Sequence, residues 1–366
     1  MEFLRDLPVY SIEKTGSIIL IVFVVFFIVL ERLFPYTKGV KIFRKGFWMD
    51  LIWYTIIQSF VLKILIFDYI IAPLKGSLGL SESGYISHWP IWVLILFFLI
   101  THDIYIYWFH RWQHHNPYLW RTHEAHHSVR DVDWLAGSRS HAVEILINQT
   151  IEFLPIFFLL DIKTAAIIVP IKALLDAVWG MWIHANVNVK TGKLQYFING
   201  PEMHQWHHGN HKEVFYANYA TKFAFWDWLF GSGFLPGLKP FTWKVNKPLS
   251  FGLPYDYPQD FFSQTIYAFF RYDFQKINQI TIIQKTIDLR KNVMKYLFNL
   301  FGIRSNILDY LFDDESQSYH IDKEEHICSK FGHKMKYYFD QNQLKFHCDT
   351  CNEDLDHDFS KFGNKP

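Results

Sequence analysis

Histidine is the residue type with the clearest chemical potential in this chain, because thirteen of its 19 histidines fall between His102 and His211. They gather into three short clusters: His110-x3-His114, His123-x2-His126-His127 and His204-x2-His207-His208. Residues at i and i+3 or i+4 share one face of a helix, so each cluster points two or three imidazoles in one direction. Imidazoles are costly to bury and repel one another when protonated. The clusters therefore predict transition-metal ligands, whereas the isolated His88 and His320 are expected to be ordinary hydrogen-bonded residues.

The number of clustered histidines indicates a pair of ions. Eight imidazoles exceed what a single ion binds, and an imidazole-rich set with few carboxylates suits iron, zinc or copper rather than magnesium or calcium. Catalytic zinc needs only three protein ligands. A pair of redox-active ions is therefore the favoured interpretation.

Long apolar segments surround these clusters. The chain has 366 residues, of which 50% are hydrophobic and 19% aromatic, and a bilayer span takes about 20 apolar residues. Five segments qualify: Ser17–Phe34, Phe47–Leu74, Trp89–Phe109, Ala142–Leu160 and Thr164–Ile183. The sequence predicts an all-α integral membrane protein with four to five transmembrane helices.

Loop charge predicts the orientation of these spans. The loop from Glu31 to Gly46 holds five Lys or Arg residues and one acid, whereas the segment from Lys75 to His88 holds a single Lys. The positive-inside rule places the first loop in the cytoplasm and the amino terminus outside. If Ala142–Ile183 crosses twice, all three histidine clusters reach the cytoplasmic side. We therefore expect a cytoplasmic helical cap that carries them, and a cytoplasmic carboxyl terminus.

The clusters and their flanks resemble the fatty acid hydroxylase / sterol desaturase superfamily of membrane-bound di-iron oxygenases. Beside the three clusters, the resemblance rests on the following segments: Asp103-x3-Tyr107-x2-His110-Arg111, Leu119-Trp120-x2-His123, Ser128, Asn218-Tyr219 and Trp226-Asp227-x-Leu229-Phe230-Gly231. It covers roughly Glu31 to Pro258, which we take as a membrane-embedded catalytic domain of residues 1–258.

The resemblance implies a chemistry that the residues alone do not supply. Two irons would activate O2 and attack an unactivated C–H bond of a membrane lipid, giving hydroxylation or desaturation; zinc or another metal could replace iron in isolated protein. No fused electron carrier is recognisable, so a separate donor of the cytochrome b5, ferredoxin or reductase type is implied. The expected ligands are His110, His114, His123, His126, His127, His184, His204, His207 and His208. His184 enters through the resemblance, and Asn188 stands where many relatives have a further histidine.

Other polar residues near the clusters are candidates for outer contacts or an extra ligand: His141, His211, Asp103, Tyr107 and Glu144. His141 is equally compatible with a ligand and with an outer hydrogen-bonding role. His102 is expected to be a membrane-facing polar group or pathway residue. His115 points away from its neighbours and is expected to be exposed.

The chain changes character after Pro258. Residues 259–325 predict two amphipathic helices, Gln259–Phe274 and Lys276–Phe301, and an acidic linker, Asp313–Glu325. Residues 326–358 contain all three cysteines of the chain in a set that suits a small structural zinc ribbon: Cys328, His333, Cys348 and Cys351. A β-like stretch, Lys334–Phe346, turns at Asp340–Gln343. The alternative is a reduced tail without metal, and disulfides are not expected in the cytoplasm.

Three other function classes stay open. A metal-dependent lipid hydrolase would use a bound hydroxide, and a catalytically inactive scaffold would use the metals only for stability. A metal transporter needs ligands in mid-membrane, but the mid-span charges Lys63, Lys172 and Asp176 form no obvious ligand set. The net charge of +1 argues against nucleic-acid binding. Fatty acyl, sterol, carotenoid and headgroup substrates are not distinguished.

Overall fold

The structure is a computed structural model. It describes residues 8–78, 84–189, 191–210, 214–235, 248 and 250–271, and the backbone of three strands between residues 336 and 357. The chain divides into two compact units, one formed by residues 1–42 and 50–252 and the other by residues 43–49 and 253–366.

Within the described residues, five helices are long and apolar enough to cross a membrane. They are α1 (Val9–Leu33), a continuous helix over Met49–Ser77, α4 (Ile91–His115), α6 (Ala142–Leu159) and α7 (Ile162–His184). The second is made of η2 (Met49–Gln58), α2 (Ser59–Ile64), η3 (Leu65–Ile71) and α3 (Ala72–Ser77). The prediction of five apolar spans is confirmed. One boundary differs, because α4 continues six residues past Phe109 and carries the first histidine cluster itself.

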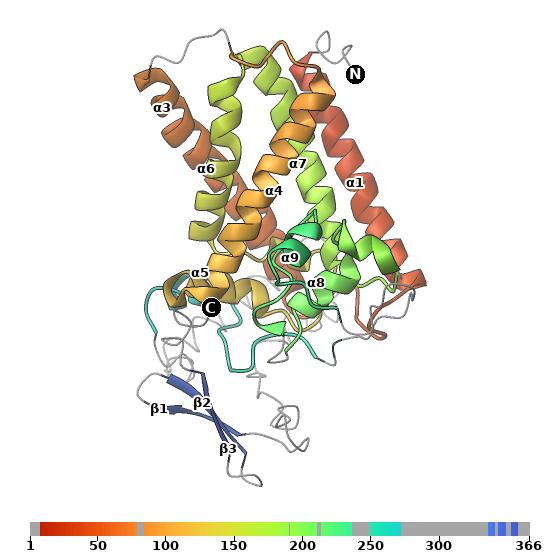
Figure 1. Ribbon diagram of the computed structural model, residues 1–366, viewed down its shortest axis with the longest axis vertical. Coiled ribbons are helices and arrows are strands. Elements are labelled where there is room, and N and C mark those ends of the chain that lie inside the picture. The colour runs from red at the N-terminus through yellow and green to blue at the C-terminus, as the bar shows by residue number, and fades with distance from the viewer. Residues whose placement is uncertain are drawn as a thin grey trace, which may run out of the picture. The chain divides into compact units, whose positions relative to one another are not determined.

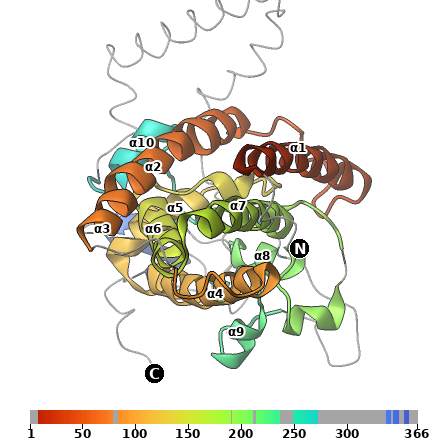
Figure 2. The ribbon, with the colours of Figure 1, turned by 90° about the horizontal axis from the view of Figure 1, so that it is seen from above.

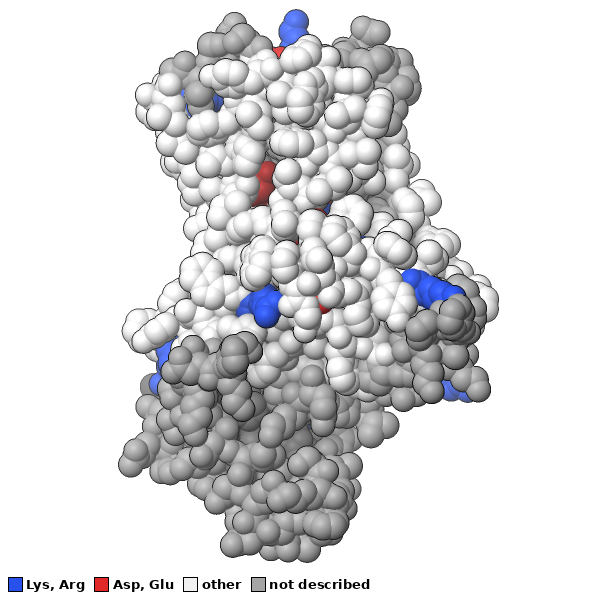
Figure 3. All heavy atoms as spheres, viewed as in Figure 1, with Lys and Arg blue, Asp and Glu red and all other residues white. Residues whose placement is uncertain are grey.

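Helix α7 lies in the middle of the bundle and contacts α1, α4 and α6 (Figure 2). Apolar side chains from the second span, α4, α6 and α7 interlock to form the core, with Ile66, Leu94, Phe98, Ile156 and Ile168 buried. On α1, by contrast, Val22 and Phe26 are 61% and 50% exposed, as expected for side chains that face lipid. Figure 3 shows almost no charged side chain on one face between its top and the level where Lys and Arg reappear.

Short helices gather at one end of the long ones (Figure 1). They are α5 (Pro117–His127), η4 (Ala136–Ser138), η5 (Gly192–Tyr196), α8 (Pro201–His207) and α9 (Phe225–Leu229). The start of α5 is set locally. The Asn116 side chain accepts hydrogen bonds from the amides of Tyr118 and Leu119, and Pro117 occupies the first helical position. This cap turns the chain back immediately after α4, so the second histidine cluster lies beside the first.

The second unit holds α10 (Phe261–Tyr267), which begins at the capping side chain of Asp260 and lies within the predicted helix Gln259–Phe274. It also holds an antiparallel sheet of β1 (Lys336–Asp340), β2 (Gln343–Cys348) and β3 (Glu353–His357), in that order. The β1–β2 hairpin confirms the predicted β stretch and its turn, whereas β3 was not anticipated.

Several tail predictions fall outside the described residues: Cys328, His333, Cys351, the helix Lys276–Phe301 and the linker Asp313–Glu325. Cys348 is placed only as the last residue of β2. The zinc ribbon stays a prediction.

Candidate metal centre

Among the described residues, nine buried histidines form two groups in which the potential ligand atoms all lie within 4.8 Å of one another. The first group, called here the five-histidine group, is His110, His114, His123, His127 and His207. The second, the four-histidine group, is His126, His184, His204 and His208. The structure thus brings together all nine predicted ligands. They come from α4, α5, α7 and α8 and from His208, which directly follows α8.

The two His-His doublets divide between these groups. His126 lies in the four-histidine group and its neighbour His127 in the five-histidine group, while His207 and His208 divide in the opposite order. Adjacent residues on a helix point about 100° apart, so one doublet can reach two ions. The ring centres of His127 and His208 are 4.8 Å apart, which brings the two groups into contact.

Most of the rings are fixed by a hydrogen bond from Nδ1. In the five-histidine group, His110, His114 and His207 donate to the backbone carbonyls of Tyr219, Phe215 and Ala217 at 2.8 to 2.9 Å. His123 donates to Glu144 Oε1 at 3.0 Å. These partners place the proton on Nδ1. The Nε2 lone pair is therefore left to face the middle of the group, as metal ligation requires.

In the four-histidine group, two of the rings are fixed by an Nδ1 hydrogen bond in the same way. His126 Nδ1 donates to the carbonyl of Arg139 at 3.2 Å and His184 Nδ1 to that of Gly180 at 2.8 Å. A Cβ at Gly137 would lie 2.6 Å from Nδ1 of His184. Only glycine at that position leaves room for the ring.

The Nε2 atoms lie as close as ligands of one ion do. The separation is 3.0 Å for His110 and His123, 2.9 Å for His184 and His204, and 3.2 Å for His204 and His208. Two nitrogens bound to one ion at about 2.1 Å lie about 3.0 to 3.4 Å apart. Within the described part of the chain, the buried Nε2 atoms of His114, His127 and His207 have no hydrogen-bond partner. Both observations fit a transition-metal ion in each group.

The electrostatics of the site favour neutral imidazoles. Burial lowers the pKa of six histidines well below the ordinary value, and neighbouring imidazoles contribute in the same direction: His123, His126, His127, His204, His207 and His208. A metal binds the neutral form of histidine. At neutral pH these side chains therefore need no deprotonation before they bind an ion.

Carboxylates support the site from outside. Asp103 on α4 accepts hydrogen bonds from Thr221 Oγ1, from the amides of Lys222 and Phe223, and from Trp226 Nε1. Asp227 accepts from the amides of Tyr219 and Ala220, although burial raises its pKa to about 6. Asp227 thereby anchors Tyr219, whose carbonyl receives the His110 proton, and Asp103 anchors the residues that follow it.

A buried ion pair supports the four-histidine group. Arg139 binds Asp50 through two contacts of 2.6 and 3.0 Å, and both side chains are at most 4% exposed. Arg139 also donates to Ser128 Oγ, and its own carbonyl receives the His126 proton. Asp50 is 89 residues from Arg139 in sequence, so no local motif indicated this pair.

The predicted outer residues take different places. Glu144 contacts His123 directly, whereas Tyr107 bonds Ser232 and Arg111 and packs against the Tyr219 ring. His141 accepts from the Val143 amide at the start of α6 and belongs to neither histidine group. His211 lies outside the described residues.

Two placements differ from the expectation. Of the two alternatives for His102, the membrane-facing one is wrong, because its side chain is 8% exposed and lies beside Lys172 and Glu152; a pathway role stays a prediction. His115 is half-buried rather than exposed, and its Nε2 lies 3.2 Å from the Tyr219 hydroxyl.

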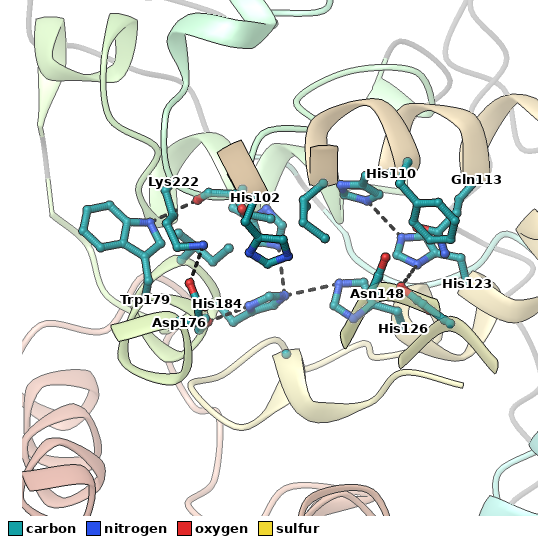
Figure 4. A pocket seen from close by; sticks show the side chains of 18 residues that line it. His102, His110, Gln113, His123, His126, Asn148, Asp176, Trp179, His184 and Lys222 are labelled. Carbon is teal, nitrogen blue, oxygen red and sulfur yellow. Dashed lines mark hydrogen bonds and ion pairs between the residues drawn. The ribbon is translucent and has the colours of Figure 1, made fainter. Parts of the chain in front are cut away.

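A cavity of about 220 Å³ opens beside the histidines. His110, His123, His126, His184 and His204 line one part of it. Its walls also include the apolar side chains of Ile106, Phe109 and Ile183. Figure 4 shows His110 and His123 on one side of this space and Asp176 and Lys222 on the other. A small molecule in the cavity would lie against both histidine groups.

Comparison with known proteins identifies the region that carries the site. The fatty acid hydroxylase family matches residues 95–232, which include all nine histidines. The chain is 26% identical over 171 residues to alkylglycerol monooxygenase of Xenopus tropicalis, covering 47% of this chain and 36% of that protein. It is 28% identical over 149 residues to ornithine lipid hydroxylase OlsE of Rhizobium tropici, covering 40% of this chain and 43% of that protein. It is 29% identical over 160 residues to lathosterol oxidase of Homo sapiens, covering 43% of this chain and 50% of that protein.

The chain thus spans half or less of the length of these three relatives. No solved structure matches it. The five apolar helices indicate a multi-pass membrane protein. Residues 95–232 therefore match the fatty acid hydroxylase family, which confirms the resemblance seen in the sequence.

Proposed function

We propose that this protein is an O2-dependent oxidoreductase that hydroxylates or desaturates an unactivated C–H bond of a membrane lipid. The observation that carries the proposal is the pair of buried histidine groups in the wall of one cavity within a bundle of apolar helices. The relatives support it, because they are named as a lipid monooxygenase, a lipid hydroxylase and a sterol oxidase.

The chain's own residues would hold two irons, one in each histidine group, and the bound irons would supply O2 activation. Glu144 places a carboxylate against Nδ1 of His123, which strengthens the ligand and fixes its ring. The apolar walls formed by Ile106, Phe109 and Ile183 exclude water and accept a hydrocarbon segment.

The overall reaction requires reducing equivalents. In hydroxylation one oxygen atom of O2 enters the C–H bond and the other leaves as water; in desaturation both leave as water. Each reaction consumes two electrons and two protons, which a separate donor of the cytochrome b5, ferredoxin or reductase type would provide. The charge of the Glu31–Gly46 loop supports a site on the cytoplasmic face.

The test is a comparison of lipid extracts from host cells that express the wild-type protein or a variant, grown under 18O2 and analysed by mass spectrometry. We expect a lipid that gains one labelled oxygen or loses two hydrogens. His126→Ala and His207→Ala, one in each group, should abolish the product because each removes a ligand. His88→Ala is the matched control, because that histidine is exposed and belongs to neither group.

Formation of the product without O2 would contradict an oxygenase and favour a metal-dependent lipid hydrolase. Equal activity of the His88 and His126 variants, at matched amounts of protein in the membrane, would contradict the assignment of the histidine groups.

A further inference from the structure

Four charged side chains and one histidine form a buried network beside the histidine groups. Lys172 on α7 is fully buried and contacts Glu152, Asp176 Oδ2 at 2.7 Å and His102 Nδ1 at 3.1 Å. Lys222, from the segment between α8 and α9, contacts Asp176 Oδ1 at 2.6 Å. Glu152, Lys172, Asp176 and His102 all belong to apolar spans. Of the mid-span charges noted in the sequence, Lys172 and Asp176 contact each other, whereas Lys63 is exposed.

This network is not a third metal site. Donor atoms of His102, Glu152 and Asp176 lie close enough together to hold an ion, but the ammonium group of Lys172 already contacts all three residues. Lys222 also lies 3.9 Å from Asp103, so the carboxylates at least match the two lysines and the network has no excess of positive charge. Burial disfavours the charged form of Lys222, but the carboxylates of Asp176 and Asp103 outweigh that effect and raise its pKa, so it stays an ammonium.

Ionisable groups within a membrane are costly and usually mark a functional path or binding site. Holding α4, α6 and α7 together would explain the buried Lys172, but it does not explain why part of the network faces the cavity. His102, Asp176 and Lys222 line the same cavity as the ligand histidines. Among the described residues, the buried Nε2 atom of His102 makes no hydrogen bond, and Glu152 Oε2 lies 3.6 Å away.

The cavity is large enough to receive part of a lipid. Its volume of about 220 Å³ corresponds to about seven water-sized groups, so one end of a lipid fits in it. A plain hydrocarbon segment would offer no polar partner to the Asp176–Lys222 pair or to His102 at that end of the cavity.

We propose that the Asp176–Lys222 pair and His102 bind an uncharged, hydroxyl-bearing end of the lipid substrate and place the oxidised carbon within a few bonds of it. This inference rests on the proposed function and names its substrate class. A hydroxyl group donates to Asp176 and accepts from Lys222 or completes the bonding of His102. Because the network has no excess of positive charge, it selects against an anionic headgroup.

The test measures binding to the purified, metal-loaded protein in lipid nanodiscs, through the rise in thermal midpoint with ligand concentration. Two matched probe pairs are used: 1-O-hexadecylglycerol with hexadecyl methyl ether, and cholesterol with cholesteryl methyl ether. Palmitate is the charged probe. We expect the wild-type protein to bind the hydroxyl member of one pair about ten- to a hundredfold more tightly than its ether. Discrimination within the first pair would indicate a glycerol-type hydroxyl in the substrate, and discrimination within the second pair a sterol-type hydroxyl.

The key variant is the double substitution Asp176→Asn/Lys222→Met. It removes one charge of each sign, because losing a single partner of a buried pair is strongly destabilising whereas losing both is tolerated. We expect its affinity ratio to fall close to one while both metals stay bound. The control is Asp68→Asn/Lys63→Met, which removes two exposed charges of the second span that do not line the cavity. His102→Leu leaves all four charges in place and should lower the ratio about two- to tenfold.

An unchanged ratio of hydroxyl to ether affinity in the metal-loaded Asp176→Asn/Lys222→Met variant would overturn the inference. Equal affinity of the wild-type protein for both members of each pair would do the same, as would tighter binding of palmitate. The two proposals fail separately. Hydroxyl discrimination without any O2-dependent product contradicts the proposed function alone, whereas labelled product without discrimination contradicts this inference alone.

Discussion

Replacing Glu144 should weaken one metal site and spare the other. Glu144 Oε1 accepts the His123 Nδ1 proton at 3.0 Å, both side chains are buried, and His123 belongs to the five-histidine group only. A hydrogen bond to a charged group contributes about 1.5 to 3 kcal/mol. Its loss in Glu144→Leu therefore corresponds to about ten- to a hundredfold weaker metal binding. Glu144→Gln keeps an acceptor without the charge, so we expect only about a five- to tenfold loss.

The assay is a competition titration with a chromophoric chelator, using protein in nanodiscs, followed by elemental analysis. The His184→Ala background disables the four-histidine group, so that the titration reports on the group that contains His123. Glu13→Leu is the control, because Glu13 is an exposed glutamate of α1. Wild-type affinity in Glu144→Leu would refute the reasoning, as would equal weakening of both sites when His184 is intact.

Three further predictions concern topology, stability and the tail. Reporter fusions after Gly84 and at Pro366 should report opposite sides of the membrane, and the same side for both would contradict the five-span topology. Asp50→Asn or Arg139→Leu should each lower the free energy of unfolding in mixed micelles by about 3–5 kcal/mol, because a buried charge loses its partner, whereas the double variant should recover most of the loss. Cys348→Ser should remove one zinc per chain and lower the folded yield, while the metals of the histidine groups remain; unchanged zinc content would exclude the ribbon.

The sequence predicted the parts of this protein that have a local signature. Apolar runs of bilayer length indicated five spans, and helical spacing indicated that His110 and His114, or His123 and His127, would converge. Glu144 could be suspected because it lies three residues after His141 and close to the second cluster. These features depend on residues that are near one another in the chain.

The remainder depends on contacts that the sequence does not encode locally. The carbonyls of Phe215, Ala217 and Tyr219 orient three ligands, but backbone atoms have no residue signature. Spacing also cannot assign a histidine of a doublet to one ion or the other. Lys172 has one partner nearby in the chain, Asp176, but its partners Glu152 and His102 lie 20 and 70 residues away, so the sequence did not indicate the network.

The divided doublets have a consequence for how the protein takes up metal. The backbone between His126 and His127, and between His207 and His208, links the two ion sites at two places. An ion bound by the five-histidine group fixes one ring of each doublet and therefore restricts the other ring as well. The second ion then meets ligands whose conformational freedom has already been reduced, so its entropic cost of binding is lower. We expect loading to be cooperative, with apoprotein and two-ion protein prevailing over the one-ion form during a titration.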